Sequence, residues 1–157
     1  MGNKKFLFKG KLEPVFPLVL LFGKTRTGKT ASPYHGLSLV DFESTNISVG
    51  TIGTYETQEI NAIVNIVVYE GYPDDADLLE GKISASGTIE VGKKNLSIGT
   101  VYGGEIIIPW PAGETAVMVI LNNDEVLKGE VRNVTFFLEY RGKKKRPSGL
   151  PRFIPPE

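Results

Sequence analysis

The sequence predicts an all-β protein, built as an antiparallel β-sandwich or jelly roll with a flexible C-terminal tail. Its apolar segments are short, rich in β-branched and aromatic residues, and bounded by Gly, Pro, Asn or Asp. They carry almost no helical period, and their spacing leaves no room for the helical crossovers that a parallel sheet needs. The chain of 157 residues has the size of one domain and can bury about two-thirds of its unfolded surface.

The N-terminal half of the chain contains five expected strands. The first opens at Phe6 and is expected to end at Gly10 and Pro14, because glycine and proline weaken or stop a strand. The second covers residues 16–22, a nearly continuous apolar run that suits a strand buried on both faces. The other three are expected at residues 37–42, 47–52 and 60–69.

The C-terminal half repeats this alternation of strands and turns. Segments rich in Gly, Pro, Asn and Asp predict turns at residues 71–75, 86–87, 109–113 and 122–124. Between them, strands are expected at residues 82–85, 88–91, 106–108 and 116–121, and the one stretch that suits a helical turn is 74–79. The last strand, residues 134–140, places one face at Val134, Phe136, Leu138 and Tyr140, and the other at Thr135, Phe137 and Glu139.

The chain divides into an expected β-sandwich domain, residues 1–141, and an extended tail, residues 142–157. The tail is rich in proline and lysine, a composition that cannot bury enough apolar surface to order itself. Its cations are candidates for phosphate contact: Lys143, Lys144, Lys145 and Arg146. Phe153 and Ile154 are candidates for an arm that docks on a neighbouring copy or on another protein.

Charge and cysteine content exclude several classes of function. Lys plus Arg balance Asp plus Glu, 18 against 18, so no overall field steers the chain onto nucleic acid or an anionic membrane. The absence of Cys excludes disulfides, Cys-ligated zinc and iron–sulfur clusters, and no cofactor is expected. The apolar run at 15–22 is interrupted by Pro17 and is too short to span a bilayer, so we expect a soluble protein without a signal peptide.

One segment matches a nucleotide-binding motif. Residues Gly23 to Thr30 fit the P-loop pattern G-x-x-x-x-G-K-[ST], in which a strand enters and a helix must leave. Pro33 opposes that helix, because proline inside a helix costs about 3 kcal/mol. We therefore interpret the segment as a β-loop and expect no enzyme activity from it. Its cations remain candidates for contact with phosphate or another anion: Lys24, Arg26 and Lys29.

Two further groups of side chains suggest binding. Asp74, Asp75 and Asp77 crowd one loop and are calcium candidates, because clustered carboxylates supply the oxygen ligands that calcium prefers. The other interpretation is a solvated acidic turn. Trp110, held between two prolines, is a candidate for stacking on a sugar ring, and its alternative role is to cover the end of a sandwich core.

The order of elements from Gly81 to Leu121 resembles that of small β-sandwich proteins. It runs strand, glycine turn, strand, Gly103-Gly104, strand, the turn around Trp110, and strand. Proteins with such an order include competence-associated nuclease inhibitors and jelly-roll decoration proteins of phage heads. The likeness rests on turn residues, so it implies a fold and transfers no functional residue.

The sequence leads to a ranked set of functional hypotheses. The first is a non-catalytic interaction or assembly module that pairs with itself as a homo-oligomer, such as a structural subunit of a viral coat or filament, because no catalytic set of residues stands out. The alternative is a monomeric module that binds another protein, such as an inhibitor of a nuclease. A third is nucleic-acid contact through the basic tail and the cationic loop. No membrane partner is expected.

Overall fold

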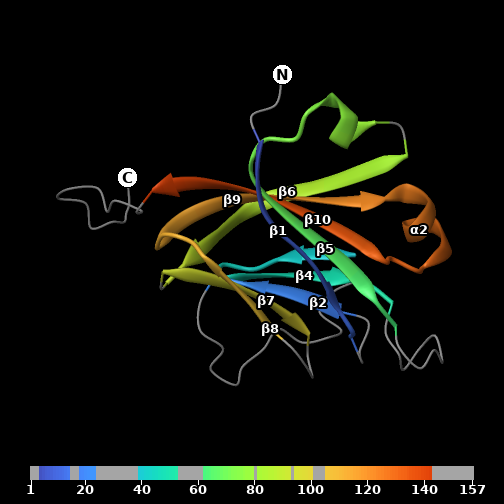
Figure 1. Ribbon diagram of the computed structural model, residues 1–157, viewed down its shortest axis with the longest axis horizontal. Coiled ribbons are helices and arrows are strands. Elements are labelled where there is room, and N and C mark those ends of the chain that lie inside the picture. Colours follow the sequence, from blue (N-terminus) through green and yellow to red (C-terminus); the bar gives the residue numbers. More distant parts are fainter. Residues whose placement is uncertain are drawn as a thin grey trace.

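The computed structural model describes residues 4–14, 18–23, 39–52, 62–79, 81–92, 94–100 and 105–142. Within them, ten strands form two five-stranded sheets that lie as two layers (Figure 1). Sheet A has the order β1 (Lys4–Leu12), β5 (Val64–Gly71), β10 (Asn133–Gly142), β9 (Gly113–Asn122) and β6 (Lys82–Val91). Sheet B has the order β3 (Val40–Phe42), β4 (Asn46–Gly50), β2 (Leu18–Phe22), β7 (Asn95–Thr100) and β8 (Glu105–Pro109).

Neighbouring strands pair antiparallel throughout, with the single exception of β5 and β10, which run parallel. The expected all-β, antiparallel sandwich is thereby confirmed. Two short helices complete the described part, η1 (Asp75–Leu78) and α2 (Asn123–Lys128). The loop that carries η1 arches over sheet A on the side away from sheet B (Figure 1).

The core lies between the two sheets and is built by alternation along the strands. In β5, Val64, Ile66 and Val68 are fully buried, while the residues between them are half-exposed. In β10, the face predicted from the sequence is confirmed at Val134, Phe136 and Leu138, which join the same cluster. The expected strand at 16–22 appears as β2, and every residue of β2 is buried, as its continuous apolar run predicts.

Two glycines that were expected to end or turn a strand lie inside strands instead. Residues 82–91 form one continuous strand, β6, and Gly87 lies in its middle, where a turn was predicted. A Cβ at Gly87 would lie 2.6 Å from Cδ2 of Phe42, so the glycine leaves room for that ring. Gly10 is likewise inside β1, where a Cβ would overlap the ring of Phe8.

The structure also contains elements that the sequence did not predict. β7 was missed because Ser97, Gly99 and Thr100 dilute its apolar signal, although residues 96–100 are all buried. α2 replaces part of the turn expected at 122–124: the Asn122 side chain accepts from the backbone N–H groups of Asp124 and Glu125 at its N-terminus. The helical turn expected at 74–79 is confirmed as η1. No helix within the described ranges combines the length and apolar character needed to cross a membrane.

Candidate functional site

The outer face of sheet A, which points away from the core, carries a row of aromatic rings. Phe137 of β10 stands opposite Tyr69 of β5, and their rings stack with centroids 5.0 Å apart and planes 19° apart. The ring of Phe6 on β1 lies at 75° to that of Tyr69, with the ring centroids 6.1 Å apart. The exposure of these rings differs widely, since 57% of Phe6 is accessible but only 2% of Phe137. The row therefore runs from an exposed end on β1 to a buried end on β10.

Beside the buried end of this row lies a groove with a volume of about 340 Å³. Its floor is formed by outward-facing residues of adjacent strands, including Phe137, Met118 and Ala116, and β6 contributes the small residues Ser86, Gly87 and Thr88. Gly71, Tyr72 and Pro73 line it from the loop that leaves β5, and Glu139 and Arg141 line it from β10. An apolar floor with a few polar groups beside it is typical of a binding site.

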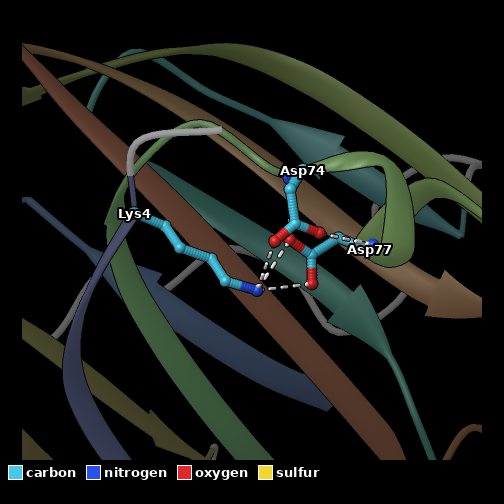
Figure 2. A network of polar contacts seen from close by, with 3 residues as sticks. All are labelled: Lys4, Asp74 and Asp77. Carbon is cyan, nitrogen blue, oxygen red and sulfur yellow. Dashed lines mark hydrogen bonds and ion pairs between the residues drawn. The ribbon is translucent and has the colours of Figure 1, made fainter. Parts of the chain in front are cut away.

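An ion cluster fixes the loop beside the groove (Figure 2). The Lys4 ammonium of β1 donates to both carboxylate oxygens of Asp77, at 2.9 and 3.0 Å, and lies 3.3 Å from Asp74 Oδ2. Asp74 and Asp77 also cap η1, because the backbone N–H of each residue donates to the side-chain carboxylate of the other. The ammonium sits 4.7 Å from the centre of the Tyr69 ring, so the cluster joins the loop to the aromatic row.

The same cluster shifts the pKa values of its members. The hydrogen bond to Asp77 is the main cause that raises the pKa of Lys4 above its ordinary 10.5, with Asp74 adding to it. The backbone N–H of Asp77 is the main cause that lowers the pKa of Asp74 below 3.8. Both groups are therefore charged at neutral pH.

These contacts give the calcium candidates a different role. Asp74 and Asp77 bind an ammonium and backbone N–H groups, so their oxygens serve to anchor the loop. Within the described residues, no group of three or more His, Cys, Asp or Glu side chains is placed to hold a metal ion. Asp75 is exposed on η1.

On β10, an ion pair borders the groove. Arg141 Nε lies 2.7 Å from Glu139 Oε1, and 52% of the arginine side chain is exposed, against 26% for the glutamate. The guanidinium has five N–H donors, so it keeps donors for another acceptor while bound to Glu139. This side of the groove therefore presents the guanidinium of Arg141, which the ion pair with Glu139 holds in place.

The candidate Trp110 is buried, with 4% of its surface exposed, and it belongs to the main core cluster. Its Nε1–H donates to Thr115 Oγ1 at 2.7 Å, a bond inside the protein. A ring in this position offers no face to a sugar, and the alternative role, covering the sandwich core, matches its surroundings.

All of the cationic candidates lie outside the described residues. This applies to the whole P-loop match except its first glycine, hence to Lys24, Arg26 and Lys29, and to the tail candidates Lys143, Lys144, Lys145, Arg146, Phe153 and Ile154. Gly23 itself is packed: its N–H donates to Thr45 O at 2.6 Å, and a Cβ would overlap the carbonyl oxygen of Glu90. That N–H is therefore not available to a phosphate.

Comparison with known proteins gives a fold and no family. No family model matches the sequence, and neither does any curated protein. Among solved structures, ComJ from Bacillus subtilis, an inhibitor of the DNA degrading activity of NucA, aligns with a TM-score of 0.61 at 10% identity, covering 88% of this chain and 98% of ComJ. The product described as crocagin biosynthetic gene J aligns with a TM-score of 0.55 at 10% identity, covering 89% of this chain and 99% of its own. At this identity the likeness establishes a shared fold.

Proposed function

We propose that this chain is a non-catalytic, protein-binding module that inhibits another protein, with a nuclease as the leading class of partner. The observation that carries the proposal is the fold likeness to ComJ, which spans 98% of that inhibitor. The alternative drawn from the sequence, a partner-binding module, is thus favoured over a structural subunit, for which no comparison offers support. Contact between the basic segments and nucleic acid stays a prediction.

The groove side of sheet A is the surface we assign to the partner. Aromatic residues, Met and Arg are enriched in protein interfaces, and all three kinds meet here: Tyr72, Met118 and Arg141. More than half of Tyr72 is exposed, at 53%, although it borders an apolar floor. Burial of such a ring by a partner would supply binding free energy without a change in the fold.

Inhibition of DNA degradation tests the proposal directly. The purified chain is titrated into NucA and a panel of other nucleases, and the initial rate of DNA degradation is followed. For a partner nuclease, the rate is expected to fall in proportion to the added chain and to level off near an equimolar ratio. A folded chain that slows none of these nucleases would refute the assignment to nucleases.

A matched pair of variants then locates the surface. Met118→Lys places a charge in the groove, whereas Ile107→Lys makes the same kind of change at an exposed residue of β8 in the other sheet. Met118→Lys is expected to weaken inhibition by about tenfold or more, the scale of an interface hot spot, and Ile107→Lys to leave it unchanged. Equal effects of the two would place the partner elsewhere.

Light scattering separates the proposal from the structural-subunit hypothesis. We expect the free chain to have the mass of a monomer at low and high salt, and the mass of a heterodimer when a partner nuclease is added. A defined homo-oligomer at both salts would instead favour the assembly hypothesis.

A further inference from the structure

The described part of the fold has four strand edges, and three of them are protected against pairing with another chain. β3 is only three residues long, and β8 has five residues that begin with Glu105 and end with Pro109. β1 is interrupted by a bulge between Phe6 and Phe8, and it exposes three lysines that form no ion pair in the described structure: Lys5, Lys9 and Lys11. Short length, proline, bulges and lysines are the devices by which proteins block edge pairing.

The fourth edge, β6, lacks these devices over most of its length. It has ten residues, and residues 83–89 contain no charge and no proline. Its pairing with β9 is regular from Lys82 to Val91, without a bulge. Ser84, Ser86 and Thr88 are exposed. A long, regular and uncharged edge is the kind that takes up another strand.

Two hydrogen bonds show which backbone groups of β6 point to the open edge. The Gly81 carbonyl accepts from Asn123 N–H on the β9 side, whereas Glu90 N–H donates to Ser44 O on the opposite side. Because these directions alternate along an antiparallel strand, the N–H and C=O groups of Ser84, Ser86 and Thr88 face the open edge. The Ser44 contact closes that edge at Glu90, which limits the open part to residues up to Thr88.

The groove begins at this same edge. The outward side chains of Ser86 and Thr88 stand opposite Met118 and Ala116 of β9, and all four line the groove. Ser86 and Thr88 belong to the edge strand and are small, so the groove is lined by short side chains on the side of the sheet edge. A strand added beyond β6 would place every second side chain on this face, next to the groove.

The size of the groove decides between two occupants. A second copy pairing through the open part of its own β6, residues 84–88, would bring only serine and threonine side chains to this face, because Ser84, Ser86 and Thr88 are the outward residues there. Such side chains cannot fill about 340 Å³. A segment of another protein with large apolar side chains at alternate positions can do so.

We infer that the β6 edge, over residues 84–88, binds an extended segment of the partner protein as a sixth strand of sheet A, with large apolar side chains of that segment in the groove. The inference rests on the proposed function, because it assigns the mode by which the partner is held. Main-chain hydrogen bonds supply affinity in this mode, and the groove selects the side chains.

The test uses linear peptides of about ten residues, the length of a long strand, selected from a display library on the full chain. Amide hydrogen exchange is then measured with and without the selected peptide. In the free chain, the amides of Ser84, Ser86 and Thr88 are expected to exchange fast, while those of Ala85 and Gly87, bonded to β9, are protected. The peptide is expected to protect the first three and to carry large apolar residues at alternate positions.

Two substitutions at one position separate backbone pairing from side-chain contact. Ser86→Pro removes an edge N–H without breaking a bond to β9, and it is expected to weaken peptide binding by about tenfold or more. Ser86→Ala keeps the N–H and is expected to bind within about twofold of the native chain. Ser84→Pro repeats the test if Ser86→Pro lowers the melting temperature.

Several results would overturn the inference. These are the selection of no peptide, protection confined to other strands, equal binding by Ser86→Pro and the native chain, or dimerisation of the free chain that Ser86→Pro abolishes. The outcome is independent of nuclease inhibition. If the chain inhibits a nuclease while its β6 amides stay unprotected, the proposed function stands and this inference is wrong. If a peptide pairs with β6 but the chain inhibits no nuclease, this inference stands and the proposed function is wrong.

Discussion

The buried pair of Trp110 and Thr115 allows a quantitative test of the core. Trp110 is 4% exposed and Thr115 is fully buried, and the indole N–H donates to the threonine hydroxyl at 2.7 Å. Thr115→Val keeps the shape of the side chain but removes the acceptor, so the indole N–H is left buried without this partner. Trp110→Phe removes the donor and leaves the hydroxyl without its indole donor.

The expected size of the effect follows from the burial of both groups. A buried polar group deprived of its partner costs about 1–3 kcal/mol, so Thr115→Val is expected to lower the free energy of unfolding by that amount. For a chain of this size, that corresponds to a melting temperature lower by about 2–12 °C. Trp110→Phe should cost more, because the smaller ring also loses core contacts. The double variant removes both polar groups, so its cost is expected to fall below the sum of the two single costs by about 0.5–3 kcal/mol.

Urea unfolding of the native chain and the three variants gives all four free energies, since a single small domain commonly unfolds in one cooperative step. The m-values should agree among the four proteins, which shows that the same surface is exposed on unfolding. If the losses of unfolding free energy in the two single variants simply add in the double variant, or if Thr115→Val is as stable as the native chain, the bond between Trp110 and Thr115 does not stabilise the fold. In that case the explanation of Trp110 as a core residue fixed by Thr115 would fail.

Three other predictions follow from local geometry. Gly87→Ala forces Phe42 to move, because the new Cβ would lie 2.6 Å from the ring. Overpacking of this kind is expected to lower the free energy of unfolding by about 1–3 kcal/mol. Thermal melts measure the effect, and an unchanged melting temperature would contradict the prediction. The cluster of Lys4, Asp74 and Asp77 contributes stability above the ordinary pKa of Asp74 and below that of Lys4. Protection of the η1 amides, measured as their exchange rate relative to an unstructured peptide at the same pH, should therefore fall as pH drops through the lowered pKa of Asp74 or rises through the raised pKa of Lys4. Lys4→Met should remove the loss at high pH and leave most of the loss at low pH, which comes mainly from the hydrogen bond of the Asp77 N–H to Asp74. Asn122→Ala removes the N-terminal cap of α2 and should cost about 0.5–2 kcal/mol, with exchange of the α2 amides increased and that of β10 unchanged.

Sequence patterns predicted those strands whose own apolar residues indicate which faces are buried. The alternation of β10 and the continuous apolar run of β2 are of this kind. Gly87 was misassigned because its role depends on the ring of Phe42, which lies far away in the sequence. β7 was missed for a related reason: serine and glycine are buried there because neighbouring strands cover them, and their own polarity gives no sign of it.

The candidate site was beyond sequence reasoning because no single segment contains it. The groove combines residues from β6, β9, β10 and the loop after β5, and only the register of sheet A brings them together. One local signal was available, the run Ser84-Ala85-Ser86-Gly87-Thr88, which is uncharged and small-sided and yet exposed in a strand. The exposure of Ser84, Ser86 and Thr88 became known only with the structure, and from the sequence Ser86-Gly87 was interpreted as a turn between two strands.

The P-loop match shows the opposite case, in which a local pattern is complete but its surroundings do not fit. In nucleotide-binding folds, the strand before such a loop lies in a parallel sheet, and the loop offers free backbone N–H groups to phosphate. Here β2 lies between β4 and β7, both antiparallel to it, and the N–H of Gly23 is already bonded to Thr45. The carbonyl oxygen of Glu90 occupies the space that a side-chain methyl group at Gly23 would need, which explains why glycine is required there without any ligand. The packing of strand ends therefore accounts for the first glycine of the motif.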